Sequence, residues 1–173
     1  MLTLVLGGAR SGKSALAERL AHESGREVVY VATAQALDGE MADRITHHRA
    51  RRPAGWISIE EPLALAAVLR QNARADRFLL VDCLTLWLSN LLGIDEGAHF
   101  ALQRNALLDG VCDLPGDIVF VSNEVGLGIT PLGELTRRFV DEAGRLHQAL
   151  AQRCDRVVFV AAGLPLTLKG TPP

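Results

Sequence analysis

The chain has 173 residues, a formal net charge of −2 at pH 7, 49% hydrophobic residues and 22% charged ones. This length and hydrophobic content predict a single domain, residues 1–173, with a sizeable core. The balanced charge gives no overall basic field, so we expect no nucleic-acid partner, and no apolar run is long enough for a membrane span. The three dispersed cysteines and the early first strand argue against a disulfide framework, a zinc site and a signal peptide, and they favour a cytoplasmic enzyme.

The first predicted elements are a buried strand over residues 2–6 and a helix over residues 15–21, with a glycine-rich loop between them. The loop reads G-x-x-x-x-G-K-S, which is the pattern of a phosphate-binding loop when a strand precedes it and a helix follows. Glycines let successive backbone N–H groups converge, and the helix start adds unpaired N–H groups and a positive dipole end. In this pattern Lys13 reaches the β- and γ-phosphates, and the Ser14 hydroxyl binds Mg²⁺.

The predicted phosphate-binding residues, called the phosphate loop below, are Gly7, Gly8, Ala9, Arg10, Ser11, Gly12, Lys13 and Ser14. The alternative is a glycine-rich turn that binds nothing, which the flanking strand and helix disfavour.

Apolar strand-like runs alternate with helical patterns along the rest of the chain. Further strands are predicted at residues 27–32, 56–59, 78–81, 118–121 and 157–160. Further helices are predicted at residues 39–52, 62–72, 84–92, 99–108 and 132–152. The tail from Gly163 is expected to form a short edge strand or to stay loose. This alternation predicts the α/β class, with a mainly parallel sheet covered by helices on both faces.

Two acidic residues follow predicted strands. Asp82 comes directly after the apolar run 78–81, where P-loop proteins place a carboxylate that binds Mg²⁺. The alternative is that Asp82 caps the helix that begins near Leu84. Glu124 follows the strand 118–121, and we expect the two acids to converge near the phosphate loop, although a loop acid is often only solvated.

The segment 40–52 carries two adjacent histidines in a basic helical pattern. At about 100° per residue, Met41, Ile45 and His48 share one stripe, whereas His47 lies off it and is able to face a ligand. A neutral histidine is a competent nucleophile towards phosphorus, and the arginines of this segment would neutralise a polyphosphate. The alternative is a solvated basic helix with two surface histidines.

Taken together, these motifs resemble one enzyme family, the bifunctional adenosylcobinamide kinase/adenosylcobinamide-phosphate guanylyltransferases of cobalamin biosynthesis. The resemblance extends from Leu2 to Lys169. The segments that carry it are residues 7–14, 30–34, 38–41, 44–48, 52–56, 82–90 and 122–129. The phosphate loop alone is shared by many proteins, but the combination of R-I-x-H-H with N-E-V-G is far more specific.

The resemblance implies two reactions. In the first, ATP or GTP phosphorylates the hydroxyl of the aminopropanol arm of adenosylcobinamide; in the second, GTP transfers GMP to a histidine and then to the phosphorylated cobinamide, which gives adenosylcobinamide-GDP. The covalent histidine corresponds to His47, and Lys13 is the catalytic lysine of the loop. The family's other nucleotide contacts correspond to Ala32, Thr33, Ala34, His48, Arg49, Ala50, Arg51, Glu60 and Asp82. Relatives have a RecA-like P-loop NTPase sheet, use Mg²⁺ and form homo-oligomers, typically trimers.

Two other functions remain compatible with the residues. A P-loop small-molecule kinase would use Lys13, Ser14 and Asp82 without a covalent role for His47. A nucleotide-binding regulatory module would show little turnover, because a fold and a loop alone do not imply an enzyme. A GMP adduct on the protein excludes the first, and multiple turnover with cobinamide excludes the second.

Overall fold

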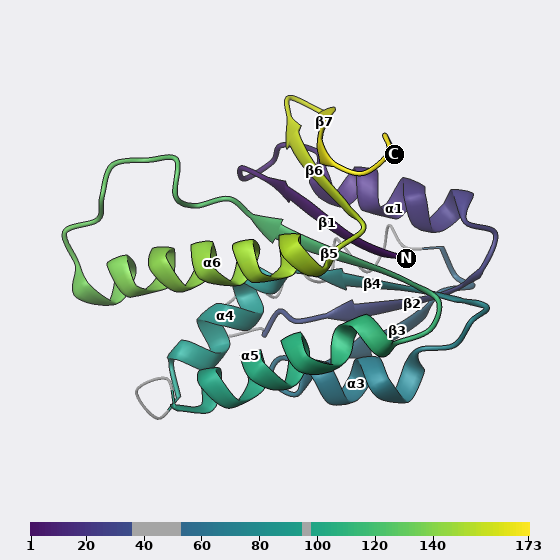
Figure 1. The fold of residues 1–173 in the computed structure, drawn as a ribbon, viewed down its shortest axis with the longest axis horizontal. Helices are drawn as coiled ribbons and strands as arrows, with labels where there is room; N and C mark the ends of the chain where they lie inside the picture. Colours follow the sequence, from purple (N-terminus) through teal and green to yellow (C-terminus); the bar gives the residue numbers. More distant parts are fainter. Residues whose placement is uncertain (36–52, 95–97) are drawn as a thin grey trace.

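The computed structural model describes residues 1–35, 53–94 and 98–173. These residues form one seven-stranded sheet with the order β3-β2-β4-β5-β1-β6-β7, and helices cover both of its faces (Figure 1). The pairs from β3 to β6 are parallel, and β7 joins β6 in the antiparallel sense. The mainly parallel α/β sheet predicted from the sequence is therefore confirmed.

The strands are β1 (Leu2–Gly7), β2 (Glu27–Ala32), β3 (Ile57–Glu60), β4 (Arg77–Asp82), β5 (Asp117–Asn123), β6 (Arg156–Ala161) and β7 (Leu164–Lys169). The helices are α1 (Lys13–Glu23), α3 (Leu65–Asn72), α4 (Leu84–Leu92), α5 (Ala98–Gly110), the 3-10 helix η2 (Val111–Asp113) and α6 (Glu134–Arg153). Within the described residues, no helix is both long and apolar enough to cross a membrane.

Most predicted elements are confirmed, with small differences at their ends. The helix predicted from residue 62 begins at Leu65, and in the turn before it the Glu61 carboxylate accepts the N–H groups of Leu63 and Ala64 at 2.9 and 2.7 Å. The helix predicted from residue 132 begins at Glu134, and the tail from Gly163 forms the edge strand β7. The predicted helix 39–52 lies outside the described residues.

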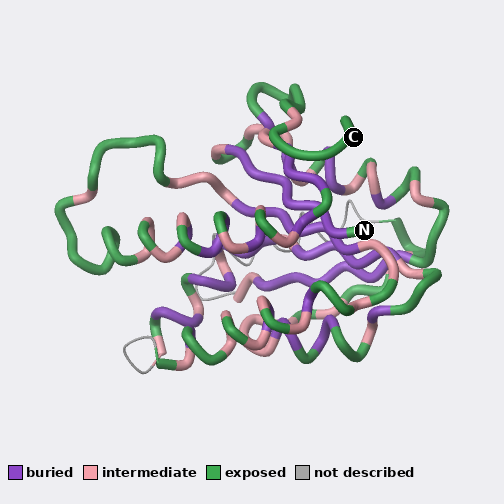
Figure 2. Tube along the Cα trace, in the orientation of Figure 1, coloured by how far each residue is buried: buried purple, intermediate pink, exposed green. Residues whose placement is uncertain are grey.

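The sheet separates two apolar clusters, one on each face. One cluster packs β1, β2, β4 and β5 against α3, α4, α5 and α6, and the other packs the opposite face of the sheet against α1. Every residue of β1 is buried, as Figure 2 shows for the centre of the sheet. Central parallel strands are buried on both faces, which explains why they read as continuous apolar runs in the sequence.

The strand order places β5 between β1 and β4. β1 runs into the phosphate loop, and β4 ends at Asp82. Because the three strands are parallel, their carboxyl ends meet at one edge of the sheet, where open α/β sheets bind their ligands.

Candidate active site

The phosphate loop curls tightly between β1 and α1. Arg10 and Gly12 have φ angles of 56° and 98°, and the N–H of Ser11 donates a hydrogen bond to the Gly8 carbonyl at 3.2 Å. Helix α1 starts at Lys13, so its unpaired N–H groups lie directly after this curl. A concave backbone followed by a helix N-terminus is an anion-binding arrangement, as the sequence pattern predicts.

The loop packs directly on β6 and on the turn between β6 and β7. The N–H of Gly163 donates to the Ser11 carbonyl at 2.8 Å. A Cβ atom at Gly7 would lie 2.5 Å from both the Ser11 Oγ and the Val160 carbonyl oxygen, and one at Gly12 would lie 3.0 Å from the Gly163 Cα. The shape of the loop therefore depends on glycine at these two positions.

Lys13 is held inside the loop. Its side chain is only 7% exposed, and its Nζ donates to the Gly8 carbonyl at 3.0 Å. Burial lowers the pKa of Lys13, and the Asp82 carboxylate opposes this shift by stabilising the charged form. Lys13 is thus close enough to Asp82 for the two charges to interact. Ser14 follows at the second position of α1 and is partly buried.

Asp82 is positioned by β2. The Tyr30 hydroxyl donates to Asp82 Oδ2 at 3.1 Å, and the Tyr30 ring stacks on Trp56 with 6.5 Å between the ring centroids. The N-cap of α4 is Cys83, without a side-chain capping hydrogen bond. Asp82 is therefore not the N-cap residue of α4, which was the alternative role considered for it from the sequence.

Thr33 fixes the backbone next to Asp82. Its Oγ1 donates to the Cys83 carbonyl at 2.7 Å and accepts the Cys83 N–H at 2.9 Å, and the side chain is fully buried. The Asn90 side chain in turn donates to the Thr33 carbonyl at 2.8 Å. The hydroxyl of Thr33, a nucleotide contact by resemblance, is thus engaged with the protein backbone.

The structure brings most of the predicted site residues to one edge of the sheet. Ala32 pairs with both Asp82 and Glu60, so the ends of β4, β2 and β3 lie in one row, separated from the loop by β5, and Ala34 follows half-buried. Glu60 is exposed. The remaining predicted residues, His47, His48, Arg49, Ala50 and Arg51, lie outside the described residues. Among the described ones, no group of three or more His, Cys, Asp or Glu side chains could hold a metal ion.

Sequence reasoning missed a buried polar network behind the end of β5. The Ser122 Oγ lies 2.7 Å from His147 Nε2 and 3.4 Å from Thr85 Oγ1, and Thr85 Oγ1 accepts the Asn123 N–H at 2.7 Å. His147 Nδ1 lies 3.5 Å from Glu124 Oε2. Desolvation lowers the pKa of His147, opposed by Glu124, so the ring is neutral at pH 7.

The signal for this network was present in α6. His147 shares the buried face of the helix with Ala143, Leu146 and Leu150, and a polar residue on such a face needs a buried partner. Glu124 was expected to converge with Asp82. Its N–H does donate to the Gly7 carbonyl at 3.0 Å, but its carboxylate is turned to the Gly126 N–H, at 2.6 Å, and to His147.

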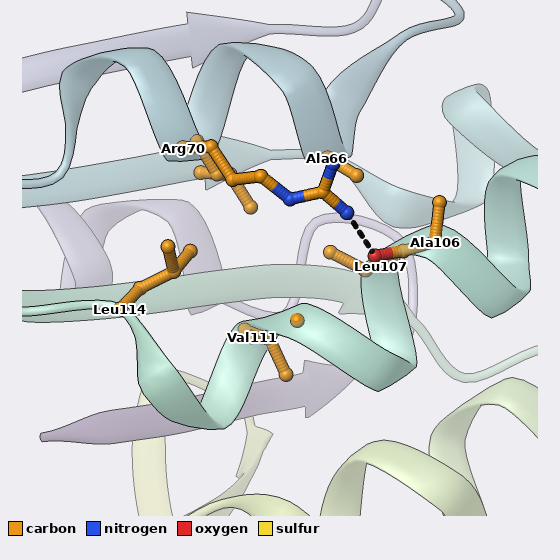
Figure 3. Close-up of a pocket in the computed structure, with 8 residues that line it drawn as sticks. Ala66, Arg70, Ala106, Leu107, Val111 and Leu114 are labelled. Carbon is orange, nitrogen blue, oxygen red and sulfur yellow. Dashed lines mark hydrogen bonds between the residues drawn. The ribbon is translucent and has the colours of Figure 1, made fainter.

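A recess between α3 and α5 is not a candidate site. It is lined mainly by apolar side chains, and Arg70 lies across it with Nη2 donating to the Ala106 carbonyl at 2.9 Å (Figure 3). It lies on the face of the sheet opposite to α1, away from the phosphate loop.

Comparisons with known proteins point to one enzyme family. A family model described as cobinamide kinase / cobinamide phosphate guanyltransferase matches residues 3–168. The chain is 66% identical over 172 residues to the bifunctional adenosylcobalamin biosynthesis protein CobP of Pseudomonas aeruginosa, with 99% of each chain covered. It is 38% identical to the corresponding protein CobU of Escherichia coli, over 98% of this chain and 100% of that one.

Similar solved structures support the fold alone. One is the RadB recombinase, with a TM-score of 0.54, 18% identity and coverage of 91% of this chain and 73% of that one. Another is a protein from Pyrococcus horikoshii, with a TM-score of 0.54, 12% identity and coverage of 99% and 87%. The sheet is thus RecA-like, which confirms the expected fold.

The close packing of the phosphate loop predicts a contrast between two neighbouring glycines. Gly7→Ala should lower the free energy of unfolding by about 1–3 kcal/mol, because its Cβ meets a backbone carbonyl at 2.5 Å. Gly8→Ala should leave stability unchanged, because no atom lies within 4 Å of its Cβ. Urea denaturation of the ligand-free proteins measures both, and equal stability of the two variants would contradict the packing described.

Proposed function

The chain belongs to the cobinamide kinase / cobinamide phosphate guanyltransferase family, and from this premise we propose how its residues divide the two reactions. As a member of this family it is a bifunctional transferase: it phosphorylates adenosylcobinamide with a nucleoside triphosphate and then transfers GMP from GTP to give adenosylcobinamide-GDP. We propose that the phosphate loop binds the triphosphate, that Lys13 stabilises the transferred phosphoryl group, and that His47 carries GMP between the two substrates.

The observation that carries this proposal is the buried position of Lys13. Its ammonium group sits inside the curl of the loop with its Nζ on a backbone carbonyl, close to Asp82 and at the start of α1. If a β- or γ-phosphate oxygen replaced the Gly8 carbonyl as acceptor, it would interact with the positive charge of Lys13 in a site shielded from water. Such preorganised charge is worth several kcal/mol in a phosphoryl-transfer transition state.

We further propose that Ser14 and Asp82 bind Mg²⁺, directly or through a water. Both offer oxygen ligands, which Mg²⁺ prefers, and it commonly takes only one or two protein ligands besides phosphates and waters. Tyr30 occupies Asp82 Oδ2, which leaves Oδ1 for the cation or its water. When bound, Mg²⁺ would neutralise charge on the nucleotide phosphates.

The metal assignment predicts that Asp82→Asn lowers the kinase rate about 100-fold and raises the Mg²⁺ concentration needed for half-maximal rate. The control is Asp76→Asn, an exposed acid just before the opposite end of β4, which should behave as wild type. Initial rates over a Mg²⁺ titration provide the measurement. An unchanged Mg²⁺ dependence in Asp82→Asn would refute the metal role.

For the second reaction we propose a covalent GMP–histidine. A neutral ring nitrogen of His47 attacks the α-phosphorus of GTP, the bond to the bridging oxygen breaks, and pyrophosphate leaves. A phosphate oxygen of the cobinamide phosphate then attacks the same phosphorus, the P–N bond breaks, and the imidazole is released. The support is the R-I-x-H-H pattern among arginines, together with the helical spacing that predicts His48, and not His47, on an apolar stripe.

This proposal predicts that α-labelled GTP labels wild type and His48→Asn but not His47→Asn. The adduct should be acid-labile, and its formation should weaken as the pH falls below about 6.5, because the attacking imidazole must be neutral. Peptide mapping after labelling locates the site. Label on His48 or on Lys13 would overturn the assignment. Absence of label on a wild-type enzyme that phosphorylates cobinamide would favour the simple kinase.

We propose that the protein is a homo-oligomer, a trimer as in the family it resembles, and that it works in the cytoplasm. The three unpaired cysteines support a reducing compartment. The segment between β5 and α6 supports an interface, because it projects from the body of the molecule and is exposed (Figure 2). Its Ile129 and Leu132 side chains are 98% and 96% exposed, and neighbouring exposed apolar residues are typical of interaction surfaces.

The interface proposal predicts that Ile129→Asp combined with Leu132→Asp converts the oligomer to a monomer. The control is Leu102→Asp, on α5, whose side chain is 64% exposed outside this segment. Light scattering coupled to size-exclusion chromatography measures the masses. A monomeric wild type, or an unchanged mass in the double variant, would contradict the proposed interface.

A further inference from the structure

Asn123, the last residue of β5, lies between the two halves of the proposed nucleotide site. It pairs with Gly7, the first residue of the phosphate loop, while Val121 of the same strand pairs with Asp82. The carboxyl end of β5 is therefore flanked by the phosphate loop on one side and by Asp82, the proposed metal ligand, on the other.

The side chain of Asn123 is on the face of the sheet that carries α1. Residues alternate between faces along a strand, and Val119 and Val121 pack in the cluster that contains α1. Ser122 points to the opposite face, where it contacts His147 of α6. Asp82 shares the face of Asn123, because it is two residues beyond Leu80 of the same cluster and meets Tyr30 there.

The backbone at Asn123 is fixed, whereas its amide side chain is not engaged. The Asn123 N–H donates to Thr85 Oγ1 at 2.7 Å, and the next N–H donates to the Gly7 carbonyl at 3.0 Å. The side-chain amide of Asn123 is half-buried and makes no hydrogen bond to any residue that the structure describes. The Asn90 amide differs, since it donates to the carbonyls of both Thr33 and Pro62.

A rigid backbone that holds an unused donor at a phosphate site indicates a ligand contact. We propose that Asn123 is a further substrate-binding residue of the kinase reaction, whose amide N–H donates to a γ-phosphate oxygen of the bound triphosphate. Thr85 is then a positioning residue, which acts through the Asn123 backbone. This inference rests on the proposed binding of the triphosphate in the phosphate loop.

The test compares a triphosphate with a diphosphate. Binding of guanosine 5′-(β,γ-imido)triphosphate and of GDP, both with Mg²⁺, is measured by calorimetry. Asn123→Ala should weaken binding of the triphosphate analogue about 10-fold or more and leave GDP unchanged, since a hydrogen bond to a charged group is lost. Asn123→Asp should weaken it further by repulsion. Asn105→Ala, an exposed asparagine on α5, is the control and should match wild type.

Two outcomes separate this inference from the proposed site. If Lys13→Ala binds both nucleotides as wild type does, the phosphate loop is not the nucleotide site, and the inference falls with it. If Lys13→Ala loses binding but Asn123→Ala keeps the wild-type ratio of the two affinities, only the inference about Asn123 is wrong.

The positioning role of Thr85 is tested with two variants. Thr85→Val removes the acceptor of the Asn123 N–H at nearly the same volume, and Thr85→Ser keeps it. Thr85→Val should lower the kinase kcat and the preference for the triphosphate analogue while KM for cobinamide is unchanged, and Thr85→Ser should restore both. A lowered melting temperature with an unchanged affinity ratio in Thr85→Val would assign Thr85 to stability alone.

Discussion

The proposed catalytic edge of the protein depends on how closely the phosphate loop approaches β6. Gly7 and Gly12 lie so near the Val160 carbonyl and the Gly163 backbone that neither position has room for a side chain without a shift. This contact fixes the curl in which Lys13 is enclosed, and α1 starts from that curl. A loop whose conformation is set by backbone packing does not have to order itself when a phosphate arrives, so less binding energy is lost to conformational entropy.

The two faces of the sheet carry residues with different proposed roles. The α1 face carries the residues that would meet the nucleotide, namely Lys13, Asp82 and Asn123. The other face carries their support, in which Thr85 and Ser122 connect the end of β5 to His147 on α6. Desolvation lowers the pKa of His147, so this histidine adds no positive charge at pH 7, and the network serves to hold the backbone in place.

The sequence was sufficient for the strands, for most helices and for the phosphate loop, because each depends on local pattern. Buried parallel strands read as apolar runs, and the loop reads as a motif. The sequence was insufficient where the position of a side chain depends on a partner far along the chain. Thr33 bonds to Cys83 fifty positions later, and the Glu124 carboxylate turns to a histidine on α6. The start of α3 was predicted three residues early, since residues 62–64 form a turn that the apolar pattern does not distinguish from the helix.

The pairing of β1 has a consequence for synthesis on the ribosome. Its partners are β5 and β6, and its first residues bond to groups 115 and 153 positions later, at Gly116 and Asp155. The phosphate loop is therefore completed long after it has been synthesised, because Gly163 must emerge before it can donate to Ser11. Until then the nascent chain exposes an apolar strand without its neighbours, which is the state that chaperones recognise. A polypeptide that stopped before Gly163 would keep its nucleotide motif in sequence but lack the hydrogen bond to Ser11 that braces the loop.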